Sequence, residues 1–441
     1  MRLRFWGTRG SIAVPGPGTN HFGGNTSCVE LTTDDGGLLI LDCGTGVRQL
    51  AAELMARNRT PVHCNILLGH THWDHIQGFP FFAPAFVKGN TVAIYGPEGS
   101  RGPLHDVLAG QMEFTYFPVD LTQLPAAISY HDLTEGVHAI GPARVATQFL
   151  NHPAMTVGYR IEADGVAVVY LVDHEPFSDD LWRAGAEPGR IDSILHEGDR
   201  RHARFMAGAD LVIHDAQYTP EEYPAKKTWG HSPYDYVVQI AAAAGVKRVA
   251  LTHHDPGHDD AAVADIEHNA RSLASQLGTG LDVFCAYEGC EIALEPRADL
   301  QPYIAATPHQ ASVAQRQFRI LVVDDQPDML TLIVRALEDE QYIVVTAGGG
   351  QEALRMIDQQ KPDLLVLDYK MLGMDGMAVM KAIRAEPATR LLPVLMLTAM
   401  TDEPSTRAGF DAGVTDYVTK PFSIPQLKAR VRACLTRAQT E

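Results

Sequence analysis

Residues 69–78 hold four potential metal ligands within six positions, in the spacing H-x-H-x-D-H. They follow an apolar run at 64–68, where we expect a short buried strand. Three imidazoles and a carboxylate at the end of such a strand would each need a polar partner. A metal ion is the simplest partner for all four, and the alternative is a polar loop with chance histidines. The four side chains are His70, His72, Asp74 and His75.

Other apolar runs also end in a histidine or an aspartate. His152, Asp173, Asp215 and His253 each come after such a run, and His231 lies in a Gly-His-Ser-Pro loop. In layered α/β folds the loops at strand ends carry the chemistry. One such ending could be a capping residue, but the repetition beside H-x-H-x-D-H predicts a shared metal centre.

Composition predicts a body and a C-terminal unit with different chemistry. The chain has 441 residues, which favours two or three domains. All 19 histidines lie before residue 310. Residues 316–441 carry 15 basic and 17 acidic residues, whereas the rest carries 21 and 37, so most of the net charge of −18 lies in the body. A body this acidic has no long-range attraction for long nucleic acids.

The cysteines and the N-terminus indicate a cytoplasmic protein. No C-x-x-C pair occurs, so the cysteines are interpreted as buried apolar residues in a reducing compartment. No apolar signal core follows Met1, and no run approaches the length of a membrane span. The six cysteines are Cys28, Cys43, Cys64, Cys285, Cys290 and Cys434.

The first half of the body is predicted to be rich in strands. Apolar runs at 27–32 and 38–42 flank an Asp/Gly turn, which is typical of a hairpin. We expect a helix to open at residues 42–46 and to continue to about residue 57. The apolar residues of 101–119 fit either an ordinary core or a wall or lid beside the metal site.

The order of these motifs resembles the metallo-β-lactamase superfamily, specifically its ribonuclease Z-like phosphodiesterase branch, over about residues 1–295. The resemblance implies an αββα sandwich, with two mixed sheets and helices outside. It also implies two metal ions and a set of ligands. One ion would be bound by His70, His72 and His152, the second by Asp74, His75 and His253, and Asp173 would bridge them. His231 resembles the histidine that protonates the leaving group, and Asp215 resembles the carboxylate that orients this histidine. Asp74, a ligand of the second ion, is also expected to be catalytic.

A ligand set of nitrogen and oxygen without thiolate suits zinc, with manganese or iron possible. The members that process tRNA carry a long arm between the histidine before proline and the bridging aspartate. Here His152 and Asp173 are only 21 residues apart, which leaves no room for that arm. We therefore expect a small phosphodiester substrate, such as a cyclic nucleotide or cyclic dinucleotide.

Residues 296–317 are predicted to be a linker, and residues 318–441 alternate strands and helices as in a parallel, doubly wound sheet. Acidic and polar residues occur at the strand ends. This second unit resembles a (βα)5 response-regulator receiver domain over its whole length. The residues that carry the likeness are Asp324, Asp325, Asp368, Thr398, Tyr417 and Lys420.

By this resemblance Asp368 would accept a phosphoryl group from a sensor histidine kinase or other phosphodonor. Asp324 and Asp325 would hold Mg²⁺ with it. Lys420 and Thr398 would contact the phosphoryl group, and Tyr417 would be the aromatic switch. Leu372 departs from the family, which often has proline there; an acidic but inert domain is the alternative.

Together these features predict a binuclear phosphodiesterase, a homodimer, regulated by phosphorylation of Asp368. Two alternatives stay open. The metals could serve a carboxyl-type substrate, such as a lactone or thioester, or the body could be a metal-binding signalling module with little turnover. His231 is the feature that favours phosphodiesters.

Overall fold

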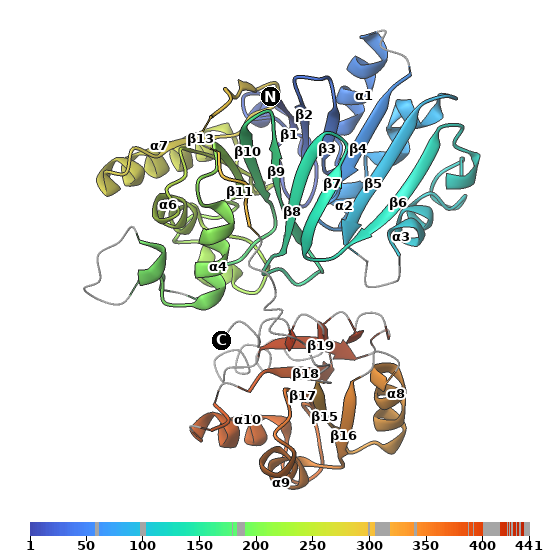
Figure 1. Cartoon of the computed structure of the whole chain (residues 1–441), viewed down its shortest axis with the longest axis vertical. Helices are drawn as coiled ribbons and strands as arrows, with labels where there is room; N and C mark the ends of the chain where they lie inside the picture. Colours follow the sequence, from blue (N-terminus) through green and yellow to red (C-terminus); the bar gives the residue numbers. More distant parts are fainter. Residues whose placement is uncertain are drawn as a thin grey trace. The chain divides into compact units, whose positions relative to one another are not determined.

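The computed structural model forms two compact units, Met1–Ala305 and Ala306–Glu441, and each is described by itself. Figure 1 shows the elements of both. The residues that the structure describes are 1–57, 61–97, 103–178, 180–182, 190–298, 300–304, 318–338, 342–386, 388–390, 392–399, 415–420, 422, 424, 427, 428, 430, 431, 434 and 435.

The N-terminal unit contains two seven-stranded mixed sheets. In spatial order the first consists of β14 (Glu291–Ala293), β1 (Arg2–Gly7), β2 (Cys28–Thr32), β3 (Leu38–Leu41), β4 (His63–Leu67), β5 (Thr91–Pro97) and β6 (Ala127–Leu133). The second consists of β13 (Asp282–Cys285), β12 (Arg248–Thr252), β11 (Leu211–Asp215), β10 (Val166–Leu171), β9 (Val157–Ala163), β8 (Ala143–Phe149) and β7 (Gly136–Ile140). Strands β3 to β6 are parallel to one another, as are β10 to β13, and the other pairings in both sheets are antiparallel.

The inner faces of the two sheets share one hydrophobic core. Phe5 and Leu39 from the first sheet pack with Tyr159 and Ile213 from the second. Helices α1 (Val47–Ala56) and α3 (Leu104–Gln111) cover the outer face of the first sheet. Helices α4 (Glu197–Met206), α6 (Tyr234–Ala243) and α7 (Asp260–Leu277) cover the second (Figure 1). The predicted αββα sandwich is confirmed.

Short helices complete the unit. They are α2 (Trp73–Ile76), α5 (Tyr223–Lys226), and the 3-10 turns η1 (Pro17–Thr19), η2 (Phe79–Phe81), η3 (Ala83–Phe86), η4 (Leu121–Gln123) and η5 (Ile191–Ser193).

One helix begins later than its sequence predicts. Helix α1 starts at Val47 rather than at 42–46, and Asp42 has a φ of +59°, which places it outside any right-handed helix. The loop between Asp42 and Val47 instead links the first sheet to the metal-binding motif: Cys43 donates to the carbonyl of His75, and Gly78 donates to the carbonyl of Cys43.

The C-terminal unit is a five-stranded parallel sheet. Its spatial order is β16 (Ile343–Ala347), β15 (Arg319–Val323), β17 (Leu364–Asp368), β18 (Val394–Ala399) and β19 (Asp416–Lys420). Helices α9 (Gly350–Gln360) and α10 (Gly376–Ala385) pack on one face, and α8 (Pro327–Glu338) packs on the other. This two-sided cover confirms the predicted doubly wound receiver fold.

Part of the predicted linker contacts the body. Tyr303 donates its backbone NH to Glu162, and Arg297 pairs with Asp210 at 2.9 Å. Residues 305–317 of that linker lie outside the described residues, so the boundaries at 295 and 317 remain predictions. Among the helices that the structure describes, none has the length and apolar character needed to cross a membrane.

Candidate metal centre and receiver site

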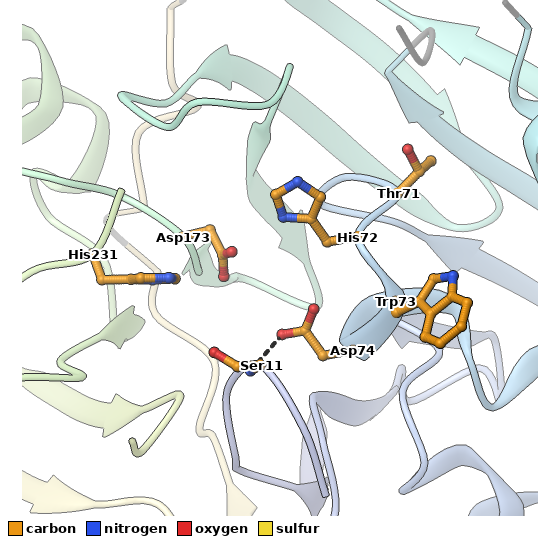
Figure 2. A pocket seen from close by; sticks show the side chains of 7 residues that line it. All are labelled: Ser11, Thr71, His72, Trp73, Asp74, Asp173 and His231. Atoms are coloured by element: carbon orange, nitrogen blue, oxygen red, sulfur yellow. Dashed lines mark hydrogen bonds between the residues drawn. The ribbon is translucent and has the colours of Figure 1, made fainter. Parts of the chain in front are cut away.

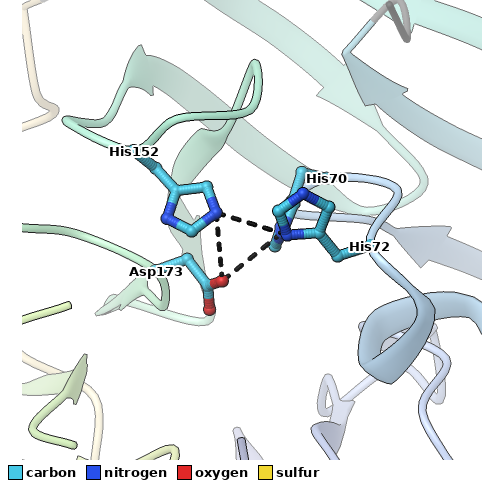
Figure 3. A group of neighbouring side chains, drawn as sticks. All are labelled: His70, His72, His152 and Asp173. Carbon is cyan, nitrogen blue, oxygen red and sulfur yellow. Dashed lines mark hydrogen bonds and ion pairs between the residues drawn. The ribbon is translucent and has the colours of Figure 1, made fainter. Parts of the chain in front are cut away.

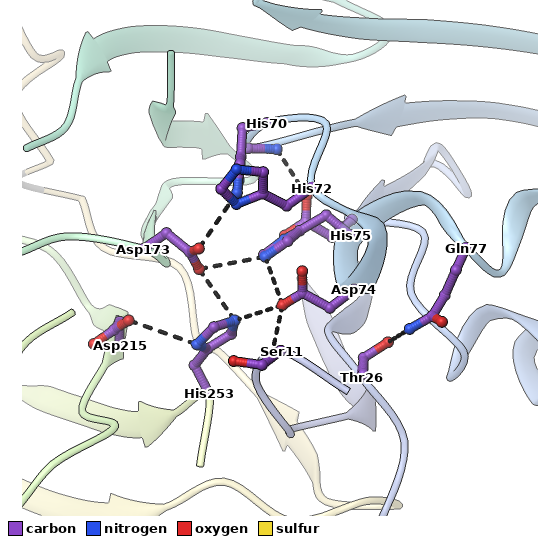
Figure 4. A network of polar contacts seen from close by, with 12 residues as sticks. Ser11, Thr26, His70, His72, Asp74, His75, Gln77, Asp173, Asp215 and His253 are labelled. Carbon is purple, nitrogen blue, oxygen red and sulfur yellow. Dashed lines mark hydrogen bonds and ion pairs between the residues drawn. The ribbon is translucent and has the colours of Figure 1, made fainter. Parts of the chain in front are cut away.

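The predicted ligands of the body meet where strands of both sheets end (Figure 4). Residues 70–75 follow β4, and the single turn of α2 turns Asp74 and His75 inward. Asp173 follows β10, Asp215 ends β11, and His253 follows β12. Side chains from parallel strands that end at one edge lie near one another, which explains the convergence.

One group consists of His70, His72, His152 and Asp173, whose ligand atoms all lie within 4.8 Å of one another (Figure 3). Asp173 Oδ2 is 3.4 Å from His70 Nε2 and 3.5 Å from His152 Nε2. His152 Nε2 is 3.4 Å from His72 Nδ1. His72 is the exposed member, and the other three are buried.

A second group consists of Asp74, His75 and His253. Asp74 Oδ2 is 3.3 Å from His75 Nε2 and 3.1 Å from His253 Nε2. Asp173 Oδ1 is 3.3 Å and 3.1 Å from the same two nitrogens. Asp173 therefore turns one carboxylate oxygen to each group.

The atoms left without partners fit divalent cations. His70 Nε2, His75 Nε2 and Asp173 Oδ1 are buried and have no hydrogen-bond partner among the residues that the structure describes. Burial lowers the pKa of His75, but the carboxylates led by Asp74 outweigh it and raise that pKa well above the usual value. The site therefore attracts positive charge, which a metal ion can supply in place of a proton. No cysteine belongs to these groups among the described residues.

Hydrogen bonds to Nδ1 hold the rings of two ligand histidines, His75 and His152, in place. His75 Nδ1 donates to Asp42 Oδ2 at 2.6 Å, and His152 Nδ1 donates to the carbonyl of Gly230 at 3.0 Å. Each bond uses Nδ1, so Nε2 faces the shared space and is the atom that can bind a metal ion. Burial also lowers the pKa of His152 to about 3, so this ring is in its neutral, ligating form.

Asp42 is a residue of the centre that the sequence analysis missed. Its carboxylate also accepts hydrogen bonds from Gly69 N at 2.7 Å and from the Tyr170 hydroxyl at 2.6 Å. A signal was present, because Asp42 ends an apolar run just as Asp173 does. Ser11 N, which donates to Asp74 Oδ2 at 2.8 Å, had no such signal.

The backbone around the centre is unusual. Asp42, Asp173, His253 and Ser11 all have φ values between +59° and +64°, in the left-handed region. Such conformations are costly for residues other than glycine and cluster at functional sites.

His231 lies beside the ligand groups and is held by Asp215. Its Nδ1 donates to Asp215 Oδ2 at 2.6 Å, and Ser232 N donates to Asp215 Oδ1 at 2.8 Å. Burial lowers the pKa of His231, but Asp215 and Asp173 outweigh it and raise this pKa to about 9. Nε2 of His231 is therefore able to carry a proton.

These residues border a pocket of about 440 Å³ (Figure 2). Its size is within the usual range for a small-molecule site. The pocket is lined by Ser11, Thr71, His72, Trp73, Asp74, Asp173 and His231.

The receiver unit brings together Asp324, Asp325 and Asp368, whose carboxylate oxygens lie within 4.8 Å of one another. Lys420 Nζ is 2.7 Å from Asp324 Oδ2 and 2.8 Å from Asp368 Oδ1. Burial raises the pKa of Asp368 in spite of this lysine. The arrangement can hold Mg²⁺ beside a phosphoryl acceptor.

Other predicted receiver residues lie on nearby strands. Thr398 is buried in β18, next to β19, which ends at Lys420. Tyr417 belongs to β19, but its side chain lies outside the described part of the chain. Leu372, the departure from the family, donates its backbone NH to Asp325 Oδ2 at 2.9 Å.

Comparison with known proteins assigns the two units. Residues 38–254 match the family described as beta-lactamase superfamily domain, and residues 320–432 match the response regulator receiver domain. The alkaline phosphatase synthesis transcriptional regulatory protein PhoP of Bacillus subtilis is 43% identical over 121 residues, which cover 27% of this chain and 50% of PhoP. The chain spans about half the length of the curated relatives it matches.

Solved structures resemble each unit separately. The metallo-beta-lactamase fold protein YhfI from Bacillus subtilis is 19% identical and covers 66% of this chain and 98% of its own, with a TM-score of 0.46. The chemotaxis protein CheY4 of Vibrio cholerae is 30% identical and covers 27% of this chain and 98% of its own, with a TM-score of 0.26. By its two family matches, the chain consists of a beta-lactamase superfamily domain joined to a response regulator receiver domain.

Proposed function

We propose that the body is a metal-dependent phosphodiesterase for a small phosphodiester and that the receiver domain regulates it. The observation that carries the proposal is the position of Asp173. Its two oxygens face separate histidine groups, and His231 lies beside it in the same pocket. Two ligand groups that share one carboxylate suit a pair of metal ions better than a single ion.

The residues present would hold both ions. His70, His72 and His152 would bind one, Asp74, His75 and His253 the other, and Asp173 would bridge them. Zinc fits this donor set best, with manganese or iron as alternatives. When bound, two such ions lower the pKa of a shared water and neutralise charge on phosphoryl oxygens.

His231 would protonate the leaving oxygen through Nε2, because Nδ1 is occupied by Asp215. The pKa of about 9 keeps the ring protonated at neutral pH, and Asp215 stabilises that charge. A phosphodiester needs this proton when its leaving group is an alcohol. A thioester releases a thiolate, which leaves with less help, so His231 favours the phosphodiester over a thioester.

The expected substrate is small. The pocket has about the volume of a drug-sized ligand. The acidic body has no long-range attraction for a polynucleotide. A cyclic nucleotide or cyclic dinucleotide meets both conditions.

The test uses purified full-length protein loaded with zinc and bis(4-nitrophenyl) phosphate as substrate. Asp173→Ala should lose at least about 100-fold in rate, as expected when a shared ligand is removed. His105→Ala, at an exposed histidine outside the ligand groups, should keep the wild-type rate. The proposal would be wrong if Asp173→Ala kept the wild-type rate, or if metal-loaded wild type showed no activity.

His231 is tested by the choice of leaving group. His231→Ala should hydrolyse the nitrophenyl ester nearly as well as wild type, because nitrophenolate leaves without a proton. With a cyclic dinucleotide, whose leaving group is a ribose alcohol, the loss should be about 100-fold or more. Equal losses on both substrates would assign His231 a structural role.

A further inference from the structure

Trp73 is an exposed indole at the rim of the catalytic pocket. Its side chain is 74% exposed, whereas Trp6 of the same domain is 5% exposed. No ring contact joins Trp73 to another aromatic side chain among the described residues. Single exposed aromatic side chains are common on protein surfaces, but this one lines the pocket that holds the ligand groups.

The backbone beneath this indole is hydrogen-bonded within a helical turn. Trp73 is the first residue of α2, and its carbonyl accepts a hydrogen bond from Gln77 N at 2.7 Å. Its neighbours His72 and Asp74 both belong to the ligand groups. An aromatic ring on a hydrogen-bonded backbone loses little conformational freedom when a ligand stacks on it.

Trp73 and His231 lie at opposite sides of the pocket, with Asp173 and His72 between them (Figure 2). In the proposed reaction the leaving oxygen is next to His231. The ester group that stays on phosphorus lies roughly perpendicular to the breaking bond, and the pocket offers it a path towards Trp73.

We infer that Trp73 is a stacking platform for a nucleobase on the retained ester group, so that the substrates are nucleotide phosphodiesters rather than alkyl ones. An indole offers its π face to any base, which makes such a platform tolerant of base identity. This inference rests on the proposed phosphodiesterase activity and deepens it.

The experiment compares two substrates with the same leaving group and the same charge. Thymidine 5′-(4-nitrophenyl phosphate) retains a nucleoside on phosphorus, and methyl 4-nitrophenyl phosphate retains only a methyl group. For zinc-loaded wild type, kcat/KM should be about 10-fold or more higher for the thymidine ester. Trp73→Ala should lose this preference through KM, and Trp73→Phe should keep most of it.

A matched control is Phe86→Ala, since Phe86 is also an exposed aromatic residue, at 37%, but does not line the pocket. This variant should keep the wild-type preference. Equal kcat/KM for the two esters in wild type, an unchanged preference in Trp73→Ala, or an equal loss in Phe86→Ala would overturn the role of Trp73 while the phosphodiesterase assignment stands. Hydrolysis of neither ester by metal-loaded wild type would overturn both.

Discussion

The carboxylate of Asp42 receives three hydrogen bonds in the wall of the metal centre, and only one of them comes from a ligand. It orients His75 and ties the start of the H-x-H-x-D-H segment, at Gly69, to Tyr170 of the second sheet. Partners of this kind set the direction and basicity of a ligating imidazole. A single residue that touches no metal can thus control the affinity for one.

Asp42→Asn should weaken metal binding about 10- to 100-fold at the group that contains His75. The amide cannot accept from all three donors as a carboxylate does. Competition with a chromophoric zinc chelator measures the change. Asp106→Asn, at an exposed carboxylate, is the control. Unchanged affinity in a folded Asp42→Asn would contradict the role given to Asp42.

A second buried carboxylate predicts a pH effect on stability. Burial raises the pKa of Asp199 to about 6, although the Tyr236 hydroxyl and Phe177 N both donate to its Oδ1. The native state therefore holds the proton more tightly than the unfolded chain does. Between the two pKa values the native state binds more protons, so this group's contribution to stability falls as the pH rises from about 4 to about 6 and then stays constant.

Asp199→Asn removes that loss because its neutral amide resembles the protonated acid. The free energy of unfolding of the variant relative to wild type should rise by roughly 1 kcal/mol between pH 5.0 and pH 7.5. Urea unfolding at the two pH values measures it. A difference that is independent of pH would show that Asp199 does not titrate in this range.

At the scale of elements, the loop that leads into α6 supports the first ligand group. Gly230 has a φ of +88°, its carbonyl accepts from His152, and its NH donates to Glu175 Oε2 at 2.9 Å. A Cβ on this residue would lie 2.1 Å from His152 Nδ1. The loop therefore places a ligand as well as His231.

Gly230→Ala should lose one bound metal ion, because the methyl group displaces His152. Gly208→Ala is a matched control, since Gly208 has a φ of +66° and nothing lies within 4 Å of its added Cβ. That control should show only the backbone cost of about 1–2 kcal/mol. Elemental analysis and thermal unfolding separate the two effects. If Gly230→Ala still binds two metal ions, the loop accommodates the methyl group without displacing His152.

The strands and motifs that could be predicted are those whose apolar or ligand pattern lies within their own residues. The apolar run that became β10 is continuous, the run that became β4 is interrupted only by Asn65, and the motif after β4 is contiguous. Strand β6 has mostly exposed or half-buried side chains at the sheet edge, so no apolar run marks it. The bond between Asp42 and His75 spans 33 positions and depends on the pairing of β3 with β4, which no local pattern contains.

At the scale of the whole molecule, the chain combines a candidate metal centre with a candidate phosphorylation site. The body and linker hold most of the net negative charge and every histidine, and the receiver holds three clustered carboxylates and Lys420. These two sites in separate units are the basis for the proposal that the receiver regulates the body. We expect a phosphoryl group on Asp368 to change the catalytic rate or the assembly of the body.

Acetyl phosphate with Mg²⁺ should change the rate of zinc-loaded wild type by roughly fivefold or more, as is usual for linked sites. Asp368→Asn should not respond, because it lacks the acceptor oxygen. Steady-state rates and light scattering, which also reports dimer formation, are the measurements. A response retained in Asp368→Asn would place the effect of acetyl phosphate elsewhere.

The left-handed backbone at Asp42, Asp173 and His253 has a consequence for the protein in the cell. Each such residue destabilises the native state by about 1 kcal/mol or more. Bound ions, which prefer the native state, offset that cost by mass action. The metal-depleted protein should therefore open more often and be cleaved faster by proteases, so its abundance in the cell should follow the metal supply.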